Sequence, residues 1–353
     1  MLSLWLGGNF CEAPALRGIS DAQILVVDAG ATKTSAVLVQ VGSGENVEVI
    51  ASVRTGPANP VSVGWETAVQ NLWQACEEVL RGFRSEQSSK PKVHYAVLAI
   101  AGTGKEETRS RLAQWFAGLG IAESFCILPD VALLVAGVSN EGVGIALVAG
   151  TGSASWGINS TGQVARTGGW GFFLDDLGSA YWMGRKALEA TVRVADGRDP
   201  ESQLLPRILQ HLCLGRVEDL IPLSPRFAKE PALVAQLAPI VLECSSEGDL
   251  TALGILEQAR NYLVELVRCT AWKLGWGSGG FPLAVGGGLL ENFEKLRGMV
   301  LERLQAIGCP PAAMTLVDPL AAAIRFVRQA LVEDGWPHWA HVYHKQGTEQ
   351  RSP

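Results

Sequence analysis

A strand–turn–strand pattern that occurs twice constrains the fold of this 353-residue chain more than any other feature. The first copy is Ile24–Gln40, with Asp28–Thr34 as its turn (the first Gly/Thr turn). The second copy is Val143–Ile158, with Ala149–Ser153 as its turn (the second Gly/Thr turn). Two apolar, β-prone runs joined by a short glycine-containing turn predict a β-hairpin. Because the pattern recurs, we expect an internal duplication with one copy in each of two domains.

The spacing of apolar residues elsewhere predicts an α/β protein. The expected strands cover 47–53, 94–100, 125–128, 281–285 and 313–317. The expected helices cover 65–83, 109–118, 131–138, most of 204–274 and a last helix that opens at Asp318-Pro319. Aspartate before proline favours a helix start, because the carboxylate caps free N–H groups and proline fits the first helical position.

Composition and charge exclude several classes of protein. Apolar residues make up 48% of the chain and charged residues 18%, which is typical of a compact protein. The formal net charge of −6 disfavours nucleic acid as the main partner, since phosphate backbones need a basic surface. No apolar run reaches the ~18 residues of a membrane span, and residues 1–9 lack the basic start of a signal peptide. We therefore expect a cytoplasmic protein without a membrane partner, and its seven scattered cysteines predict free thiols.

The first Gly/Thr turn has the composition of a phosphate-binding loop. Small residues such as Gly30 let the backbone approach a ligand closely, and consecutive N–H groups in such a turn bind anions. Thr32 and Thr34, on either side of Lys33, carry hydroxyls that can donate to phosphate oxygens. Asp28, at the end of the preceding strand, could hold a water molecule on Mg²⁺. A plain hairpin turn with a capping aspartate is the alternative interpretation.

The second Gly/Thr turn repeats this chemistry with Gly150, Thr151, Gly152 and Ser153. Two such turns, each between strands, indicate two sides of one polyphosphate site. A third turn, Gly286–Gly288 (the triple-glycine turn), lies between an expected strand and a helix. Its glycines permit the close approach of a flat ligand or of a phosphate at the helix N-terminus. A flexible loop is the alternative for this turn.

Asp130 follows an apolar strand and precedes an apolar helix, which places it at the edge of a sheet where ligands bind in α/β proteins. One interpretation is a helix N-cap, a common use of aspartate at such a position. The other is a general base that removes the proton of an attacking hydroxyl.

The segment Gly168–Trp182, here called the aromatic loop, is dense in glycine and aromatic residues around the adjacent carboxylates Asp175 and Asp176. Sugars bind to such surfaces, because their C–H faces lie on aromatic rings while carboxylates accept hydrogen bonds from their hydroxyls. A loop that lines the core and carries solvated aspartates is the alternative.

The order of the motifs DAGATKT, GPANP, PD, AGTGS, GGWGFFLDDLGSAYW and AVGGG resembles that of the BadF/BadG/BcrA/BcrD-type ATPases, and most of all their N-acetylglucosamine kinases. The similarity spans about residues 24–332 and is most specific in the aromatic loop. It implies an α/β actin-like (ribonuclease H-like) ATPase fold of two domains, each with a mixed five-stranded sheet, and a central cleft that holds ATP and Mg²⁺. The expected parts are a peripheral segment at 1–20, a first domain at 21–128 completed by a helix at 319–334, a second domain at 129–318, and a tail at 335–353.

The resemblance also implies roles for individual residues. Asp130 would be the catalytic base and Asp28 would serve the metal. The nucleotide would contact both Gly/Thr turns and the triple-glycine turn, through Gly30, Thr32, Lys33, Thr34, Gly150, Thr151, Gly152, Ser153, Gly286, Gly287 and Gly288. The sugar would contact Asn59, Thr103, Gly104, Asp130, Gly169, Trp170 and Asp176.

The implied reaction transfers the γ-phosphoryl group of ATP to an amino sugar, with N-acetylglucosamine phosphorylated at O6 as the first choice. The family's usual G-D-E-G-S reads Asp175–Ser179 here, with Asp175 for glycine and Leu177 for glutamate. This departure leaves glucosamine, N-acetylmannosamine and N-acetylmuramic acid as alternative substrates.

Two other functions, and the oligomeric state, stay open at this point. An ATPase activator of a radical dehydratase or reductase would hold an iron–sulfur cluster through cysteines, and no cysteine pair lies near either Gly/Thr turn. A sugar sensor without turnover would lack the base, whereas Asp130 is present. A homodimer is an open option.

Overall fold

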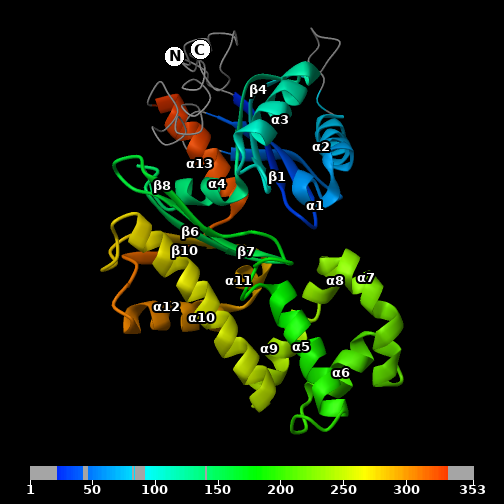
Figure 1. The fold of residues 1–353 in the computed structure, drawn as a ribbon. Helices are drawn as coiled ribbons and strands as arrows, with labels where there is room; N and C mark the ends of the chain where they lie inside the picture. The colour runs from blue at the N-terminus through cyan, green and yellow to red at the C-terminus, as the bar shows by residue number, and fades with distance from the viewer. Residues whose placement is uncertain (1–21, 43–46, 82, 84–91, 140, 333–353) are drawn as a thin grey trace, which may run out of the picture. The chain divides into compact units, whose positions relative to one another are not determined.

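The computed structural model describes residues 22–42, 47–81, 83, 92–139 and 141–332, and its chain divides into two compact units (Figure 1). Unit 1 combines residues 1–144, 158–163 and 317–353, and unit 2 combines 145–157 and 164–316. The expected peripheral segment at 1–20 and tail at 335–353 lie outside the described residues. No helix of the described part is long and apolar enough to cross a bilayer.

Unit 1 is built on a five-stranded sheet with the order β3-β2-β1-β4-β5. Its strands are β1 (Ala22–Ala29), β2 (Thr34–Val41), β3 (Val47–Thr55), β4 (Val93–Ile100) and β5 (Ala122–Leu128). β1 pairs antiparallel with β2 and parallel with β4, which in turn pairs parallel with β5. The antiparallel β1–β2 pair confirms the first predicted hairpin.

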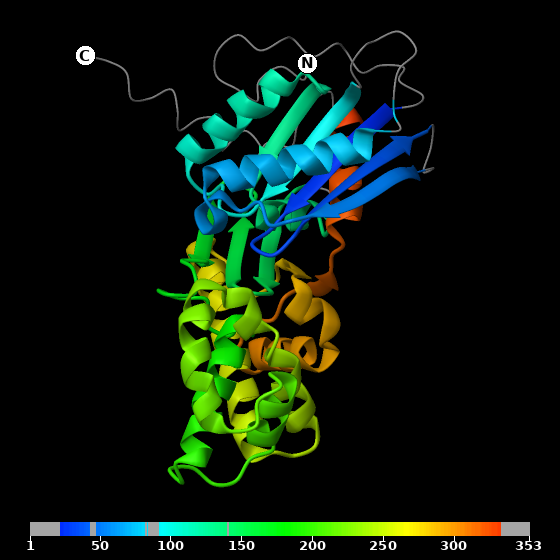
Figure 2. The same cartoon turned by 90° about the vertical axis from the view of Figure 1, so that its right-hand side faces the viewer.

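Helices cover both faces of this sheet (Figure 2). They are α1 (Pro60–Val63), α2 (Trp65–Leu80), α3 (Glu106–Leu119), α4 (Asp130–Ala136) and α13 (Pro319–Val332). Leu25 of β1, Leu72 of α2 and Phe116 of α3 belong to one buried cluster. The alternate residues of β1, such as Val26, point to the opposite face and are also buried. On that side α13 contacts β1 and α4. Because β1 is buried on both faces, its sequence is a continuous apolar run and does not alternate between apolar and polar residues.

Unit 2 repeats the topology of unit 1. Its strands are β6 (Gly144–Ala149), β7 (Ser153–Ile158), β8 (Val164–Gly168), β9 (Pro282–Gly286) and β10 (Ala313–Leu316). The order β10-β9-β6-β7-β8 is that of unit 1 with β6 to β10 in the places of β1 to β5. β6 pairs parallel with β9 and β9 with β10, as β1 does with β4 and β4 with β5. The duplication inferred from two hairpins therefore extends to both complete sheets, and the fold is that of the actin-like ATPases.

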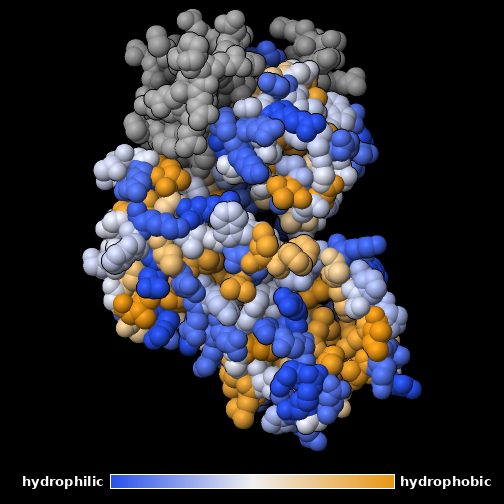
Figure 3. All heavy atoms as spheres, viewed as in Figure 1, coloured by the Kyte–Doolittle hydropathy of each residue, from blue (hydrophilic) through white to orange (hydrophobic). Residues whose placement is uncertain are grey.

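A large helical layer distinguishes unit 2. It consists of α5 (Ala180–Ala195), α6 (Leu204–His211), the 3₁₀ helix η1 (Val217–Leu223), α7 (Ser224–Lys229), α8 (Pro231–Ala235), α9 (Ala238–Ser246), α10 (Leu250–Lys273), α11 (Gly288–Asn292) and α12 (Glu294–Ala306). The central helix α10 contacts α5, α9, α12 and β8. The space-filling view shows a mixed surface, with hydrophobic residues reaching it over this layer (Figure 3).

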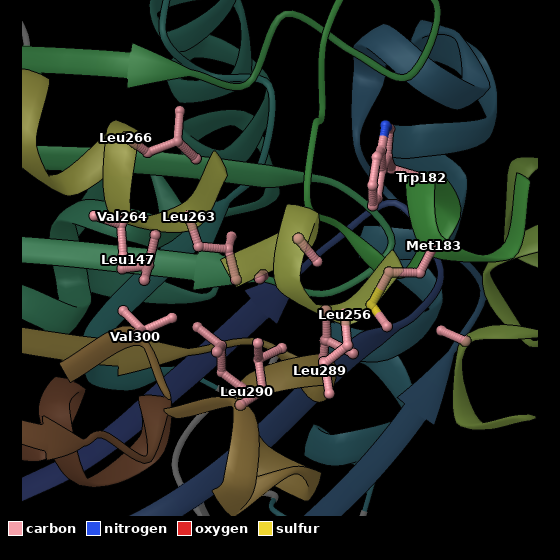
Figure 4. Close-up of a cluster of buried hydrophobic side chains, with 14 of the residues drawn as sticks. Leu147, Trp182, Met183, Leu256, Leu263, Val264, Leu266, Leu289, Leu290 and Val300 are labelled. Carbon is pink, nitrogen blue, oxygen red and sulfur yellow. The ribbon is translucent and has the colours of Figure 1, made fainter. Parts of the chain in front are cut away.

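The core of unit 2 joins the sheet to these helices. Leu147 of β6 lies beside Val264 of α10, while Met183 of α5 approaches Leu256 (Figure 4). The ring of Trp182 also packs edge-on against Tyr262, with the ring centroids 5.3 Å apart. These contacts fix the start of α5 to the core. They also limit the positions that the preceding residues of the aromatic loop can take.

Three expectations need correction. The sequence analysis placed no strand at Val164–Gly168 and no helix at Ala180–Ala195, since the glycine and aromatic residues of the aromatic loop conceal the end of the strand and the start of the helix. It also ended the first domain at residue 128, whereas unit 1 continues to Gly144. The physical reason is that α4 packs against β4 and α13, which both belong to unit 1.

Candidate functional site

The first Gly/Thr turn connects β1 to β2 in unit 1. It is closed by a 2.9 Å hydrogen bond from the Gly30 N–H to the Lys33 carbonyl, and its tip at 31–33 is exposed. Within the described residues, the N–H groups at the tip and the Thr32 hydroxyl have no hydrogen-bond partner. Thr34, by contrast, is fully buried, and its hydroxyl makes no hydrogen bond to any of the described residues. The predicted nucleotide contacts therefore fall on two sorts of groups, exposed donors at the tip and one buried hydroxyl behind it.

Two neighbouring segments of unit 1 are tied to this turn. The Gly30 carbonyl accepts hydrogen bonds from the N–H groups of Ala58 and Asn59, both at 3.2 Å. Asn59 Oδ1 accepts the Val61 N–H at 2.9 Å and so caps α1, while the side-chain nitrogen Nδ2 of Asn59 donates to none of the described residues. A Cβ atom at Gly102 would lie 2.2 Å from that same Oδ1, so only glycine permits this approach. The predicted sugar residue Asn59 thus lies beside the predicted phosphate loop.

The loop after β4 contains the predicted sugar residues Thr103 and Gly104. The Thr103 hydroxyl donates to the Ile100 carbonyl at 2.6 Å and is buried, so its side chain serves the loop itself. Arg109, 7% exposed, donates to the carbonyls of Thr103 and Gly104 and pairs with Glu106. Any contact of this loop with a sugar would therefore come from the exposed Gly104 or from backbone groups.

Asp130 is the first residue of α4, immediately after β5, and is half-buried. The N-cap position belongs to Pro129, which makes no side-chain cap. The cap interpretation of Asp130 therefore does not fit, although a carboxylate in the first turn still interacts favourably with the helix dipole.

The second Gly/Thr turn connects β6 to β7 in unit 2 and is anchored to the aromatic loop. The Gly150 N–H donates to the Gly152 carbonyl at 2.9 Å and closes the turn. The Gly150 carbonyl accepts the Ala180 N–H at 2.8 Å, and the Thr151 carbonyl accepts the Tyr181 N–H at 3.3 Å. In the described part of the chain, the N–H groups of Thr151 and Gly152 and the Thr151 hydroxyl have no such partner. Unpaired N–H and hydroxyl donors in a turn are the groups that bind anions in proteins.

The triple-glycine turn packs directly on the second Gly/Thr turn. Gly287 has a φ of +89°, and a Cβ atom there would lie 2.6 Å from the Ala149 carbonyl oxygen. A Cβ atom at Gly150 would lie 3.5 Å from the Gly288 nitrogen. The turn is ordered by a 3.0 Å hydrogen bond from the Gly287 N–H to the Glu291 carboxylate. The flexible-loop alternative is therefore wrong for this turn.

Gly287→Ala is expected to lower the free energy of unfolding by about 2–4 kcal/mol, because the new Cβ meets both a left-handed backbone and a carbonyl. Gly288→Ala is the matched control, since the nearest atom to its Cβ would be Asn292 Nδ2 at 3.9 Å. Urea unfolding of both variants without nucleotide measures the difference. Equal stability of the two variants would contradict the close packing of the turns.

The aromatic loop is shaped by an arginine that sequence reasoning missed. Arg166 Nε donates to the Gly168 carbonyl at 3.0 Å, and Arg166 Nη2 donates to the Gly169 carbonyl. The guanidinium carbon of Arg166 lies 5.6 Å from the centroid of the Trp170 ring. Trp170 is 70% exposed although the Arg166 guanidinium lies over its ring. The only signal in the sequence was a cation two residues before the glycine pair.

Asp176 is the buried carboxylate of this loop, 8% exposed and with a φ of +57°. Burial raises the pKa of Asp176 from 3.8 to about 6; the Ser153 N–H opposes the shift, Asp175 adds to it and Arg166 opposes it. Because the folded-state pKa lies above the unfolded one, this group stabilises the fold below about pH 4. That contribution, roughly 2–3 kcal/mol, is lost as the pH rises through 6. At neutral pH the protein therefore carries a carboxylate that disfavours folding.

The predicted site residues fall into two groups, one in each unit. Unit 1 brings together the first Gly/Thr turn, Asn59 and the loop after β4, with Asp130 at the next strand end. Unit 2 brings together the second Gly/Thr turn, the triple-glycine turn and the aromatic loop. Sequence reasoning missed the supporting residues Arg109 and Arg166, because only the folded backbone shows which carbonyls they bind.

Two similar proteins are named as amino sugar kinases. The chain is 30% identical over 290 residues, 79% of its length and 88% of the relative, to an N-acetyl-D-glucosamine kinase of Dictyostelium discoideum. It is 28% identical over 273 residues, 77% of its length and 87% of the relative, to an N-acetylmuramic acid/N-acetylglucosamine kinase of Clostridium acetobutylicum.

Among solved structures, a candidate N-acetylglucosamine kinase of Chromobacterium violaceum is similar in fold, with a TM-score of 0.68 and 22% identity over 87% of this chain and 99% of that one. The sequence pattern of the BadF/BadG/BcrA/BcrD ATPase family matches residues 25–310. With two sheets of one topology and glycine-rich turns at corresponding strand ends, the chain belongs to the BadF/BadG/BcrA/BcrD ATPase family.

Proposed function

We propose that this protein transfers the γ-phosphoryl group of ATP to the O6 hydroxyl of N-acetylglucosamine. That it is an ATP-dependent sugar kinase follows from its family and from relatives that are named as sugar kinases. The choice of N-acetylglucosamine and of O6 is our proposal, supported by the names of both relatives. Their names favour a kinase over the ATPase activator considered above.

One observation carries the proposal: in unit 2, the aromatic loop is hydrogen-bonded to the second Gly/Thr turn. The loop offers what a sugar needs, an exposed Trp170 ring and a carboxylate in Asp176. The turn offers what a phosphate needs, unpaired N–H donors and the Thr151 hydroxyl. A sugar surface joined to a phosphate surface fits an enzyme that transfers a phosphoryl group to a sugar.

The chemistry would need little covalent participation by the protein, since phosphoryl transfer depends mainly on positioning and charge neutralisation. Asp130 would orient the attacking hydroxyl and accept its proton as the new P–O bond forms and ADP leaves. The exposed tip of the first Gly/Thr turn and the donors of the second would bind the phosphate oxygens. Asn59, Gly169, Trp170 and Asp176 would hold the sugar.

The residues present also fit Mg²⁺. Asp28 is a half-buried carboxylate near the end of β1, where it pairs in register with Ser35 and Ala99 and is the first residue of the first Gly/Thr turn. One carboxylate suits this ion, which proteins usually bind through one or two carboxylates together with substrate phosphates. When bound, Mg²⁺ would neutralise charge on the transferred phosphate.

The activity is tested by measuring ADP release with N-acetylglucosamine, glucosamine, N-acetylmannosamine, N-acetylmuramic acid and glucose. We expect the highest kcat/KM with N-acetylglucosamine and a 6-phosphate product by ³¹P and ¹H NMR. A higher kcat/KM with another sugar, or phosphate at another carbon, would contradict the proposal.

Thr151→Val is expected to weaken ATP binding about ten- to hundredfold, because a hydrogen bond to a charged group contributes roughly 1.5–3 kcal/mol. Sugar KM should change less than threefold. Thr161→Val is a control, since the Thr161 hydroxyl is bonded locally to Asn159 at 2.7 Å. Isothermal titration calorimetry measures the ATP affinity of both variants. An unchanged ATP affinity in the Thr151 variant would exclude the second Gly/Thr turn from the phosphate site.

A further inference from the structure

Asp176 connects the aromatic loop to the second Gly/Thr turn through its side chain. The Ser153 N–H donates to Asp176 Oδ1 at 3.2 Å, and the Ser153 hydroxyl donates to the Leu177 carbonyl at 2.8 Å. The backbone of Gly152 lies against the same carboxylate, since a Cβ atom there would be 2.8 Å from Oδ2. The shape of residues 152–153, which include the Gly152 N–H of the proposed phosphate surface, therefore depends on where this carboxylate lies.

The two oxygens of Asp176 have different surroundings. Oδ1 accepts the Ser153 N–H, whereas Oδ2 accepts no hydrogen bond from any residue in the described part of the chain. Oδ2 is also not completely enclosed by the described residues. One carboxylate can thus bind a sugar hydroxyl with one oxygen while it holds the phosphate turn with the other.

The backbone conformation and the burial of Asp176 both cost free energy, which a role limited to holding the aromatic loop does not explain. Its φ of +57° is one of two positive values among the described non-glycine residues, and the side chain is buried as a charge at neutral pH. A neutral amide would make the same bond to Ser153 with less loss of hydration. A neutral acceptor would therefore suffice to hold Ser153, whereas the charge adds strength to a hydrogen bond from a donor that binds at Oδ2.

We propose that Asp176 is a positioning residue for the second Gly/Thr turn, which it holds in its phosphate-binding shape and couples to occupancy of the sugar site. The positioning part needs no sugar. The coupling part rests on the proposed function, because it requires a sugar hydroxyl at Oδ2. A hydroxyl bound there would fix the carboxylate, and through Ser153 it would fix the turn before the nucleotide arrives.

The experiment measures ADP affinity by calorimetry, without and with saturating N-acetylglucosamine, in the full chain. Asp176→Ala removes both oxygens, and we expect ADP affinity without sugar to fall about ten- to hundredfold. Asp176→Asn keeps an oxygen acceptor for Ser153, so its ADP affinity without sugar should stay within about threefold of the unmodified protein. Its sugar KM should rise at least tenfold, since an amide replaces the charge at the hydroxyl.

Asp175→Ala is the matched control, because it removes the neighbouring carboxylate, whose side chain has no hydrogen bond to the described residues. It should leave ADP affinity unchanged. If the alanine variant of Asp176 does not fold, Asp176→Gly removes the same carboxylate and suits the positive φ. Unchanged ADP affinity in a folded alanine or glycine variant would overturn the positioning role, as would an equal loss in the Asp175 control.

The coupling appears as a difference between the two ADP titrations. We expect sugar to strengthen ADP binding at least fivefold in the unmodified protein and by less than twofold in Asp176→Ala. Equal strengthening in both would overturn the coupling. If no sugar in the ADP-release screen is phosphorylated, the proposed function fails, while the sugar-free titrations still decide whether Asp176 positions the turn.

Discussion

Asp130→Asn is expected to lower kcat by about 10²–10⁴ while ATP affinity stays within a few-fold, because the amide can accept no proton from the sugar hydroxyl. Asp130 starts α4 directly after β5, with Pro129 in the capping position, so its carboxylate is not needed to begin the helix. Coupled ADP release and calorimetry with ATP measure the two quantities. A variant with kcat within threefold of the original would exclude Asp130 as the base.

The duplication offers a matched control for this substitution. Asp318 lies between β10 and α13 as Asp130 lies at the junction of β5 and α4, but Asp318 just precedes its helix whereas Asp130 is the first residue of α4. Its carboxylate accepts the Ala321 N–H at 2.8 Å and therefore caps α13. Asp318→Asn keeps a good capping residue, and we expect kcat and the melting temperature to change little. A loss of activity as large as that of Asp130→Asn would point to a general effect on folding.

Gly184→Ala is expected to lower the free energy of unfolding by about 3 kcal/mol or more, the largest effect on stability among our predictions. Gly184 lies inside α5, and a Cβ atom there would be 1.9 Å from the Val234 carbonyl oxygen of α8. No rotation relieves such a contact, so α5 and α8 must move apart. Loss of the α5 position would also displace Ala180 and Tyr181, which hold the second Gly/Thr turn.

Gly254→Ala provides the opposite case in unit 2. Gly254 also lies inside a helix, α10, but nothing lies within 4 Å of a Cβ atom there. Alanine should stabilise that helix by about 0.5–1 kcal/mol, because glycine is a poor helix former. Chemical denaturation of both variants should give shifts of opposite sign. A neutral Gly184→Ala variant would show that α5 and α8 are less closely packed than described.

Much of the fold could be predicted from the sequence, because it depends on local periodicity. The apolar runs at 24–27 and 143–148 are buried strands in the structure, and the turns that follow them contain glycine where the backbone reverses. β8 and α5 were not predicted, because each lacks a clear local periodicity at one end. The last residue of β8 and the first residues of α5 lie in the aromatic loop, where glycine and tryptophan give no clear period.

The candidate site was predictable at the level of residue types but not of contacts. Glycine and threonine at strand ends suggested phosphate binding, and the aspartates suggested a sugar. The bond between Asp176 and Ser153 joins residues from different elements, and no local rule reveals it. No local rule reveals the burial of Thr34 either, because its neighbours Thr32 and Lys33 are exposed.

The discontinuous course of unit 1 has a consequence for how the protein is made. Residues 317–332 complete unit 1, and α13 covers the side of β1 and α4 that is otherwise apolar. On the ribosome, β1 to β5 emerge long before α13, with the whole of unit 2 synthesised in between. Until then, that face of the nascent sheet stays open to water and to other chains. Ribosome-bound fragments that end before residue 317 should therefore recruit chaperones, and a supplied α13 peptide should release them.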